Sequence, residues 1–181
     1  MPSADGPTLV LDVETQHLAH EVGGWGRLER LRVSVAVTHN SLSGVYTVYT
    51  EDQMDALAEE LARAQRVVGY NLLRFDYPVL QPYTQLPLGA LPTVDMLDHL
   101  HRALGFRVPL DSVAQATLGL GKAGNGLDAV RWFREGKVDQ VAEYCRQDVE
   151  ITRKVYEFGQ RRRYVAFIDK RSRLQQVPVG W

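Results

Sequence analysis

The sequence comprises 181 residues, 45% hydrophobic and 24% charged, which is enough to bury the core of one domain, so we expect a single domain over residues 1–181. It has no run of about 18 apolar residues and no basic-then-apolar leader, so we expect neither a membrane span nor a secretory signal. The formal net charge of −1 at pH 7 excludes a general electrostatic attraction to polyanions.

Two acidic residues follow the first expected strand. Residues 8–11 form a short apolar, β-branched run that is typical of a strand buried on both faces. Asp12 and Glu14 come next at i and i+2, so both carboxylates point the same way. Burying both is costly unless a cation or a hydrogen-bond partner compensates them. Taken alone, the pair could simply mark the solvated end of the strand.

The next strands and helices follow from alternation and turn signals. Residues 31–39 and 44–50 indicate paired strands, and residues 51–64 indicate a helix. Residues 66–70 indicate another strand, after which Asn71 starts a turn. Asp76 then stands at a strand-to-helix junction, where aspartate commonly serves as a helix N-cap.

The C-terminal half adds a strand at residues 91–96, helices around 96–104 and 111–118, and a glycine-rich segment at 119–126 that we expect to be a mobile loop. Residues 138–158 are amphipathic and contain neither proline nor glycine, which predicts a helix. Tyr144 and Asp148 are four residues apart in it, so their Cβ atoms lie about 6 Å apart on one face. A packing role for Tyr144 and an ion-pair role for Asp148 remain alternatives.

The order of these elements predicts an α/β fold. We expect a mixed five-stranded sheet, antiparallel through its first three strands, with helices on both faces. The core should span about residues 8–158. Residues 164–168 and 174–179, separated by a polar turn, indicate a C-terminal β-hairpin within a basic segment at about 161–181.

This C-terminal segment is basic. Six cations stand there against the single acid Asp169, and they are Arg161, Arg162, Arg163, Lys170, Arg171 and Arg173. Tyr164, Phe167 and Trp181 lie among them, so phosphate contacts and base stacking are both available. A hairpin packed on the body with a solvated charged turn explains the pattern equally well.

Taken together, the acidic residues resemble a known signature. D-x-E, N-x2-3-(F/Y)-D and Y-x3-D, in that order, are typical of the DEDDy branch of the DnaQ-like 3′-to-5′ exonucleases, which have a ribonuclease H-like fold. The chain matches as Asp12/Glu14, Asn71/Phe75/Asp76 and Tyr144/Asp148. The step from Asn71 to Asp76 is similar in length to that of the proofreading domains of family-B DNA polymerases. The sister DEDDh branch has a histidine five residues before its last aspartate, and Glu143 stands there instead.

The resemblance implies a two-metal mechanism with Mg²⁺ or Mn²⁺. Asp12 would bridge both ions, Glu14 and Asp148 would complete the first shell, and Asp76 would hold the second ion mostly through water. Tyr144 would orient the attacking water, so that a nucleoside 5′-monophosphate leaves from a 3′ end. The residues implied for binding the terminal nucleotide are Thr15, Leu18, Asn71 and Phe75.

Several function classes stay open at this point. DNA is slightly favoured as substrate, single-stranded or frayed, with the C-terminal hairpin providing most of the electrostatic attachment. An exoribonuclease resembling RNase D would have the same site residues. A catalytically silent module that recruits a helicase or polymerase is the alternative outside enzymology. The lone Cys145 permits no internal disulfide, and we expect the cytoplasm as the compartment.

Overall fold

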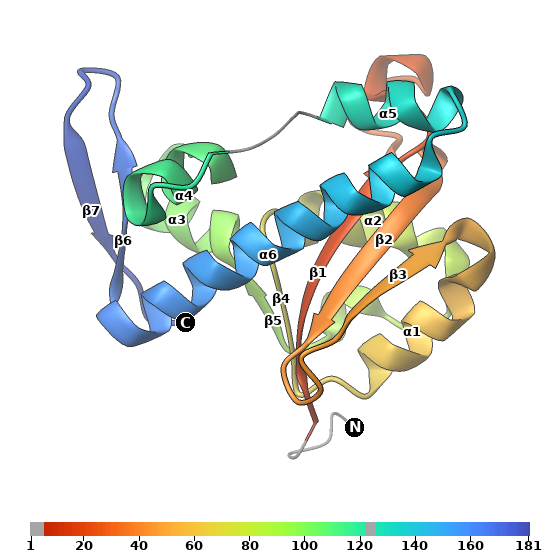
Figure 1. The fold of residues 1–181 in the computed structure, drawn as a ribbon, viewed down its shortest axis with the longest axis horizontal. Helices are drawn as coiled ribbons and strands as arrows, with labels where there is room; N and C mark the ends of the chain where they lie inside the picture. Colours follow the sequence, from red (N-terminus) through yellow and green to blue (C-terminus); the bar gives the residue numbers. More distant parts are fainter. Residues whose placement is uncertain (1–5, 122–125) are drawn as a thin grey trace.

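The computed structural model describes residues 6–121 and 126–181 of the chain. At its centre lies a mixed five-stranded sheet in the order β3-β2-β1-β4-β5, and a separate two-stranded sheet stands near the C-terminus (Figure 1). β2 pairs antiparallel with β1 and β3, whereas β4 pairs parallel with β1 and β5. This confirms the expected α/β class, the mixed sheet and the C-terminal hairpin.

Most of the observed bounds lie within three residues of the expected ones, but the first strand and the long helix each run four residues further, to Thr15 and Arg162, and the helix Gly126–Arg134 had no expected bounds. The strands are β1 (Thr8–Thr15), β2 (Val33–Asn40), β3 (Tyr46–Thr50), β4 (Arg66–Gly69), β5 (Thr93–Asp95), β6 (Tyr164–Ile168) and β7 (Leu174–Pro178). The α-helices are α1 (Met54–Ala62), α2 (Tyr77–Leu80), α3 (Met96–Leu104), α4 (Leu110–Leu118), α5 (Gly126–Arg134) and α6 (Val138–Arg162). Because α6 continues to Arg162, the expectation that Arg161 and Arg162 belong to the hairpin segment was wrong.

β1 contributes to both halves of the core because its side chains alternate. Leu9, Leu11 and Val13 are buried among residues of α1 and α2, whereas Val10 is buried among residues of α6. Figure 1 shows α6 crossing the sheet. Asp12 and Glu14 follow Val10 at steps of two, so the same alternation directs them toward α6.

The C-terminal hairpin is fixed to the body of the molecule. Thr117 on α4 accepts a hydrogen bond from the Ala166 amide at 2.9 Å and donates one to the Ala166 carbonyl at 3.1 Å. Gly159 lets the indole of Trp181 lie directly on α6, because a Cβ there would come within 2.5 Å of the indole nitrogen. That nitrogen donates to the Tyr156 carbonyl at 3.1 Å. β6 and β7 therefore have a defined position beside α4.

The glycine-rich segment expected as a mobile loop at residues 119–126 is described only at its ends, since residues 122–125 lie outside the described ranges. Gly119 ends α4 with a φ of +69°, a conformation that favours glycine. Over residues 6–121 and 126–181, none of the helices combines the length and the apolar character needed to span a bilayer.

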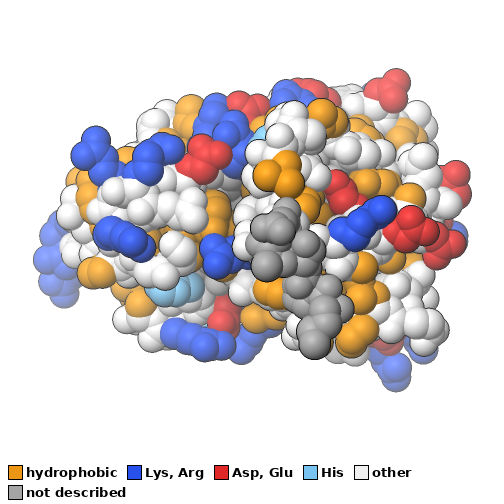
Figure 2. All heavy atoms as spheres, turned by 90° about the horizontal axis from the view of Figure 1, so that it is seen from below, with side chains coloured by type: hydrophobic (Ala, Val, Ile, Leu, Met, Phe, Trp, Pro, Cys, Tyr) orange, Lys and Arg blue, Asp and Glu red, His pale blue; other side chains and the backbone are white. Residues whose placement is uncertain are grey.

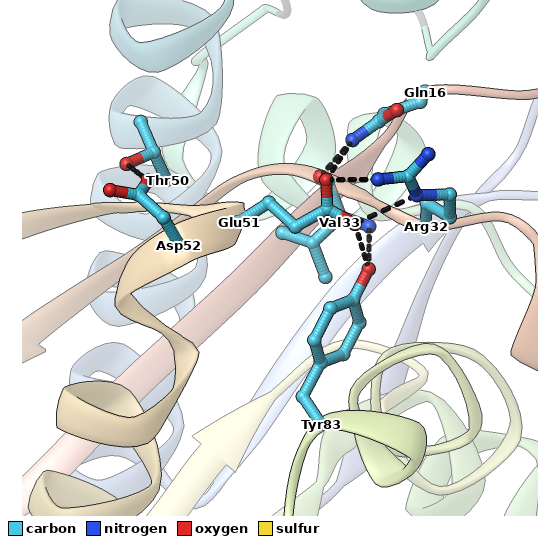
Figure 3. Close-up of polar contacts among 7 residues, drawn as sticks. All are labelled: Gln16, Arg32, Val33, Thr50, Glu51, Asp52 and Tyr83. Atoms are coloured by element: carbon cyan, nitrogen blue, oxygen red, sulfur yellow. Dashed lines mark hydrogen bonds and ion pairs between the residues drawn. The ribbon is translucent and has the colours of Figure 1, made fainter.

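A carboxylate network fixes the chain just beyond β1 (Figure 3). Glu51 accepts two hydrogen bonds from the Arg32 guanidinium at 2.8 and 2.7 Å, one from Gln16 at 2.8 Å and one from the Tyr83 hydroxyl at 2.5 Å. The Tyr83 hydroxyl in turn accepts from the Val33 amide at 3.1 Å. We call the side chains of Gln16, Arg32, Glu51 and Tyr83 the Glu51 clamp. It ties the residue that follows Thr15 to β2 and to the segment after α2.

The Glu51 clamp has a defined pH dependence. Partial burial alone raises the pKa of the Glu51 carboxyl, but hydrogen bonds from Arg32, Tyr83 and Gln16 outweigh it and hold the pKa below its ordinary value. A lowered folded-state pKa stabilises the protein above the ordinary pKa of glutamate, and this stabilisation is lost as the pH falls through the folded-state value.

We therefore expect Glu51→Gln to lower the free energy of unfolding at neutral pH by roughly 1 to 2 kcal/mol, because its charge-assisted hydrogen bonds become neutral ones. Urea unfolding across the acidic range should show this deficit shrinking as the pH falls. Glu59→Gln is the control, since within the described residues the Glu59 carboxylate forms an exposed ion pair with Arg63 at 3.7 Å and no other ion pair or hydrogen bond. Equal deficits in the two variants at every pH would contradict a special role for the clamp.

Candidate active site

Three carboxylates converge between β1 and α6. Asp12 and Glu14 come from β1, and Asp148 comes from α6. One ligand oxygen of each lies within 4.8 Å of the others. The alternation of β1 and the helical spacing of α6 account for the convergence, because α6 packs across the face on which both β1 acids stand. We call these three residues the acidic triad.

Asp76 reaches the same pocket from the end of β4. β1 pairs with β4 only over Thr8–Val10, so beyond Val10 the β4 side of β1 is open. The chain leaves β4 at Gly69, where a Cβ would come within 2.4 Å of the Leu72 side chain. It then turns through Asn71, whose φ is +83°, into a π-helical turn that ends at Asp76. This turn directs Asp76 toward the open side of β1.

Asp76 does not act as the helix N-cap that the sequence suggested as an alternative. Its backbone is already helical, at φ −60° and ψ −46°, and its side chain makes no capping hydrogen bond. The helical turns already begin at Leu72, before Asp76. The cap alternative was therefore wrong, and the side chain is available to the pocket.

Burial and neighbouring charge perturb the Asp76 carboxyl. The side chain is 3% exposed, and burial followed by the nearby charges of Asp12 and Asp95 raises its pKa well above the ordinary value. Hydrogen bonds with backbone groups, including that of Val13, oppose the rise without cancelling it. A buried carboxyl beside other carboxylates is stabilised in its charged form by a bound cation.

The donor set fits a hard divalent cation. All the side chains concerned offer carboxylate oxygens, which Mg²⁺ and Mn²⁺ prefer over the nitrogen and sulfur donors typical of zinc sites. Asp76 Oδ1 is buried and has no hydrogen-bond partner within residues 6–121 and 126–181. The acidic triad can thus bind a metal ion, and Asp76 offers a further oxygen on the same pocket.

Tyr144 and Cys145 stand next to each other on α6 and face the site in different ways. The Tyr144 side chain lines the pocket, is 4% exposed and packs edge-on against Trp132 with ring centroids 5.9 Å apart. The Cys145 sulfur lies 3.4 Å from both the backbone oxygen and Oδ2 of Asp12. Sequence reasoning gave Cys145 no role at the site. Only the crossing of α6 over β1 reveals its contact with Asp12.

The pocket around these residues has a volume of about 420 Å³. Thr15, Leu18 and Phe75 line it, as the resemblance implied for a nucleotide site. Asn71 is not among the lining residues. Its side-chain oxygen instead accepts a hydrogen bond from Arg107 at 2.6 Å.

The pocket also has apolar lining residues that the sequence did not assign to it, namely Trp25, Tyr70, Leu127 and Val130. Trp25 is 74% exposed, and its ring centroid lies 6.4 Å from that of Phe75. It stands at the pocket and remains exposed, so it does not cover the core.

Asp95 braces the turn that carries Asp76. It caps α3 by accepting hydrogen bonds from the Leu97 and Asp98 amides at 3.1 and 3.2 Å. It also accepts from the Asn71 amide at 2.8 Å and the Leu73 amide at 3.0 Å. The start of α3 and the π-helical turn are therefore joined through one buried carboxylate. Its position directly before an amphipathic helix was the only sequence signal for it.

Comparison with known proteins identifies the fold family. A family model described as RNase_H superfamily matches residues 9–159, which include the acidic triad, Asp76 and Tyr144. A search of curated proteins gave no match to the chain.

Asp95→Ala is expected to lower the free energy of unfolding by roughly 1 to 3 kcal/mol, because it removes a helix cap and leaves the Asn71 and Leu73 amides without their acceptor. Asp98→Ala is the matched control, since it breaks only the partly exposed ion pair with Arg102 at 2.7 Å and should cost less than about 1 kcal/mol. Urea unfolding measures both variants. Equal losses would show that the brace does not stabilise the turn.

Proposed function

Because the chain belongs to the RNase_H superfamily, we propose that it is a metal-dependent 3′-to-5′ exonuclease of the DEDDy type that releases nucleoside 5′-monophosphates. The observation that carries this proposal is the joint lining of one pocket by the acidic triad, Asp76 and Tyr144. These five residues belong to the three ordered motifs of the sequence, which also include Asn71 and Phe75.

The carboxylates would hold two divalent ions, Mg²⁺ or Mn²⁺. The triad would hold the first ion, and Asp12 with Asp76 would hold the second. When bound, such ions lower the pKa of the attacking water and stabilise the leaving oxygen. In the protein itself, burial of Asp76 and the short distances within the triad supply preorganised oxygen ligands.

Tyr144 is proposed to orient the attacking water through its hydroxyl. Its ring packs edge-on against Trp132, which restricts the ring, and the side chain lines the pocket. Glu143, which stands where the DEDDh branch has its histidine, is exposed and paired with Arg146 at 2.8 Å. Hydrogen bonds from Arg146 and Gln147 lower the pKa of the Glu143 carboxyl to about 2, so it is a poor base. This supports the tyrosine branch.

The apolar walls suit a single terminal nucleotide. Leu18 and Phe75 offer apolar contact to a base, and Trp25 offers an exposed aromatic face beside them. Aromatic and apolar side chains bind unpaired bases without sequence preference. We therefore propose a single-stranded or frayed 3′ end as substrate. DNA is slightly favoured over RNA in this proposal, and the proposed compartment is the cytoplasm.

Two other functions remain candidates. An exoribonuclease resembling RNase D needs the same site residues, so the choice between DNA and RNA depends on measurement. A silent module that recruits a helicase or polymerase requires no intact metal ligands. The presence of all four acids and Tyr144 on one pocket argues against such a module.

The deciding experiment uses matched DNA and RNA single strands labelled at the 5′ end, incubated with Mg²⁺ or Mn²⁺. The proposal expects a ladder that shortens one nucleotide at a time, with release of 5′-monophosphates and no cleavage of strands whose 3′ hydroxyl is blocked. Internal cleavage would contradict the exonuclease proposal. No cleavage of either strand under any metal would favour the silent module.

Asp148→Asn and Asp12→Asn are expected to abolish this activity while keeping or raising the stability of the metal-free protein, because each removes one charge from a repelling cluster. Glu143→Gln is the control, since it changes a carboxylate on the same helix outside the pocket and should leave activity intact. Activity and urea unfolding are measured together. Unfolding of the two aspartate variants, or near-normal activity in either of them, would contradict the roles proposed for these ligands.

Tyr144→Phe is expected to slow the reaction by roughly 10²-fold or less, because a hydroxyl that positions water contributes less than a metal ligand. Calorimetric titration with Mn²⁺ should give the same metal affinity as the wild type. Loss of metal binding in Tyr144→Phe would mean that Tyr144 holds the metal site together and does not orient water.

A further inference from the structure

A second groove, of about 600 Å³, lies between the C-terminal hairpin and the loop that joins α3 to α4. Residues of both segments line it, among them Phe106, Arg107, Phe167, Lys170, Arg171 and Arg173. We propose that this basic groove binds the phosphates and one base of a single-stranded nucleic acid whose 3′ end lies in the acidic pocket. The inference rests on the proposed exonuclease function and extends it to the part of the strand upstream of the reacting nucleotide.

The charge of the basic groove favours a polyanion. Four cationic residues line it against one acid, Asp169. Asp169 is committed to the hairpin turn, since it accepts hydrogen bonds from the Arg171 and Arg173 amides and from the Arg173 side chain. These contacts, with the backbone of Arg173 first, lower the pKa of Asp169 to about 2.

The charges of the remaining cations are not compensated by acidic side chains in the part of the chain that the structure describes, although Arg107 also donates a hydrogen bond to the Asn71 side chain. Across residues 6–121 and 126–181, Arg107, Lys170 and Arg171 form no ion pair with an acidic side chain, and all three are exposed. Figure 2 shows the same bias on a larger scale, with Lys and Arg side chains prevailing toward the end of the molecule that carries β6 and β7. The surface around the basic groove is therefore positively charged, although the net charge of the whole chain is close to zero.

An exposed aromatic ring stands among these cations. Phe106 is 50% exposed and packs in a T-shaped arrangement against Phe167, with ring centroids 5.8 Å apart. A phenyl ring that is fixed on one side and open on the other can stack a base, and stacking next to cations is typical of surfaces that bind single strands. The repeated pairing of phosphates with bases in a single strand matches the combination of cations and an exposed ring.

The basic groove adjoins the acidic pocket through two hydrogen bonds. Tyr70, which lines the acidic pocket, donates its hydroxyl hydrogen to the Val108 carbonyl at 2.5 Å. Arg107 donates to Asn71, the residue after Tyr70, at 2.6 Å. Val108 and Arg107 both line the basic groove. In the proposed arrangement, a strand whose 3′ end lies at the acidic triad passes Tyr70 before it reaches the cations. The direction in which the strand runs is therefore fixed by the position of its 3′ end.

This assignment differs from what the sequence suggested for the basic segment as a whole. Arg161 and Arg162 lie on α6 and do not line the basic groove, and Arg161 pairs with Glu157 at 3.8 Å. The cations of the hairpin turn, together with Arg107 from a distant part of the sequence, are the ones that share a groove. Arg161 and Arg162 therefore provide a charge-matched control.

The test measures binding without turnover. In an Asp148→Asn background, fluorescence anisotropy follows a labelled oligothymidylate of about 16 nucleotides over a range of salt concentrations. Lys170→Gln/Arg171→Gln should weaken binding about 10-fold or more at low salt and reduce the salt slope by about 1.4, because each lost phosphate contact removes roughly 0.7. Phe106→Ala should weaken binding at all salt concentrations without changing the slope.

Controls separate the outcomes. Arg161→Gln/Arg162→Gln should change affinity and slope much less, and a dinucleotide, which is too short to reach the basic groove, should bind all variants alike. Thermal unfolding verifies that each variant is folded. If both double variants weaken oligonucleotide binding equally, or neither does, the basic groove is not the nucleic-acid surface. A protein partner would then be the better occupant.

The experiments distinguish a wrong groove proposal from a wrong exonuclease proposal. If the wild type releases 5′-monophosphates but the groove variants bind normally, only the groove proposal is overturned. If the groove variants lose affinity but the wild type releases nothing, the basic groove is a nucleic-acid surface of a silent module.

Discussion

Repulsion among carboxylates is the constraint on which the rest of this structure depends. The acidic triad brings three of them within 4.8 Å, and Asp76 is buried on the same pocket with a raised pKa. Like charges at such distances in a partly buried site oppose folding unless a cation compensates them. The geometry therefore has to be imposed by the surrounding core. α6 does this by packing its apolar face across β1, so that Val10 is buried directly before the acids begin.

Two other carboxylates hold in place the segments that follow β1 and β4. Glu51 and Asp95 each accept several hydrogen bonds and join segments that are far apart in the sequence. Glu51 holds the chain beyond β1, and Asp95 holds the turn beyond β4. The triad acids differ from these two because they face one another across a pocket. The same side-chain chemistry thus gives a structural brace or a ligand site, depending on the groups around it.

Charge segregation reconciles a formal net charge of −1 with the proposed nucleic-acid substrate. Electrostatic interactions between exposed groups are screened beyond about 8 Å at physiological ionic strength, so the local surface matters more than the total. The negative pocket and the basic groove are separated by Tyr70 and Asn71. Under the proposed function, the cations would attract a strand while its 3′ end would meet carboxylates whose charge is compensated by bound metal ions.

The sequence alone determined the strands, the long helix and the hairpin, because periods of two and of four residues are local properties. The expectation that the acidic residues share one site came from the resemblance of the three ordered motifs to a known family and not from these periods. Tertiary structure decided the rest. Asn71 turns toward Arg107, which is 36 positions away, and Cys145 meets Asp12 across 133 positions. The basic groove likewise needs the α3–α4 loop and the hairpin to pack together. No local pattern records such contacts, since they depend on how helices and strands cross and not on the spacing within any one of them.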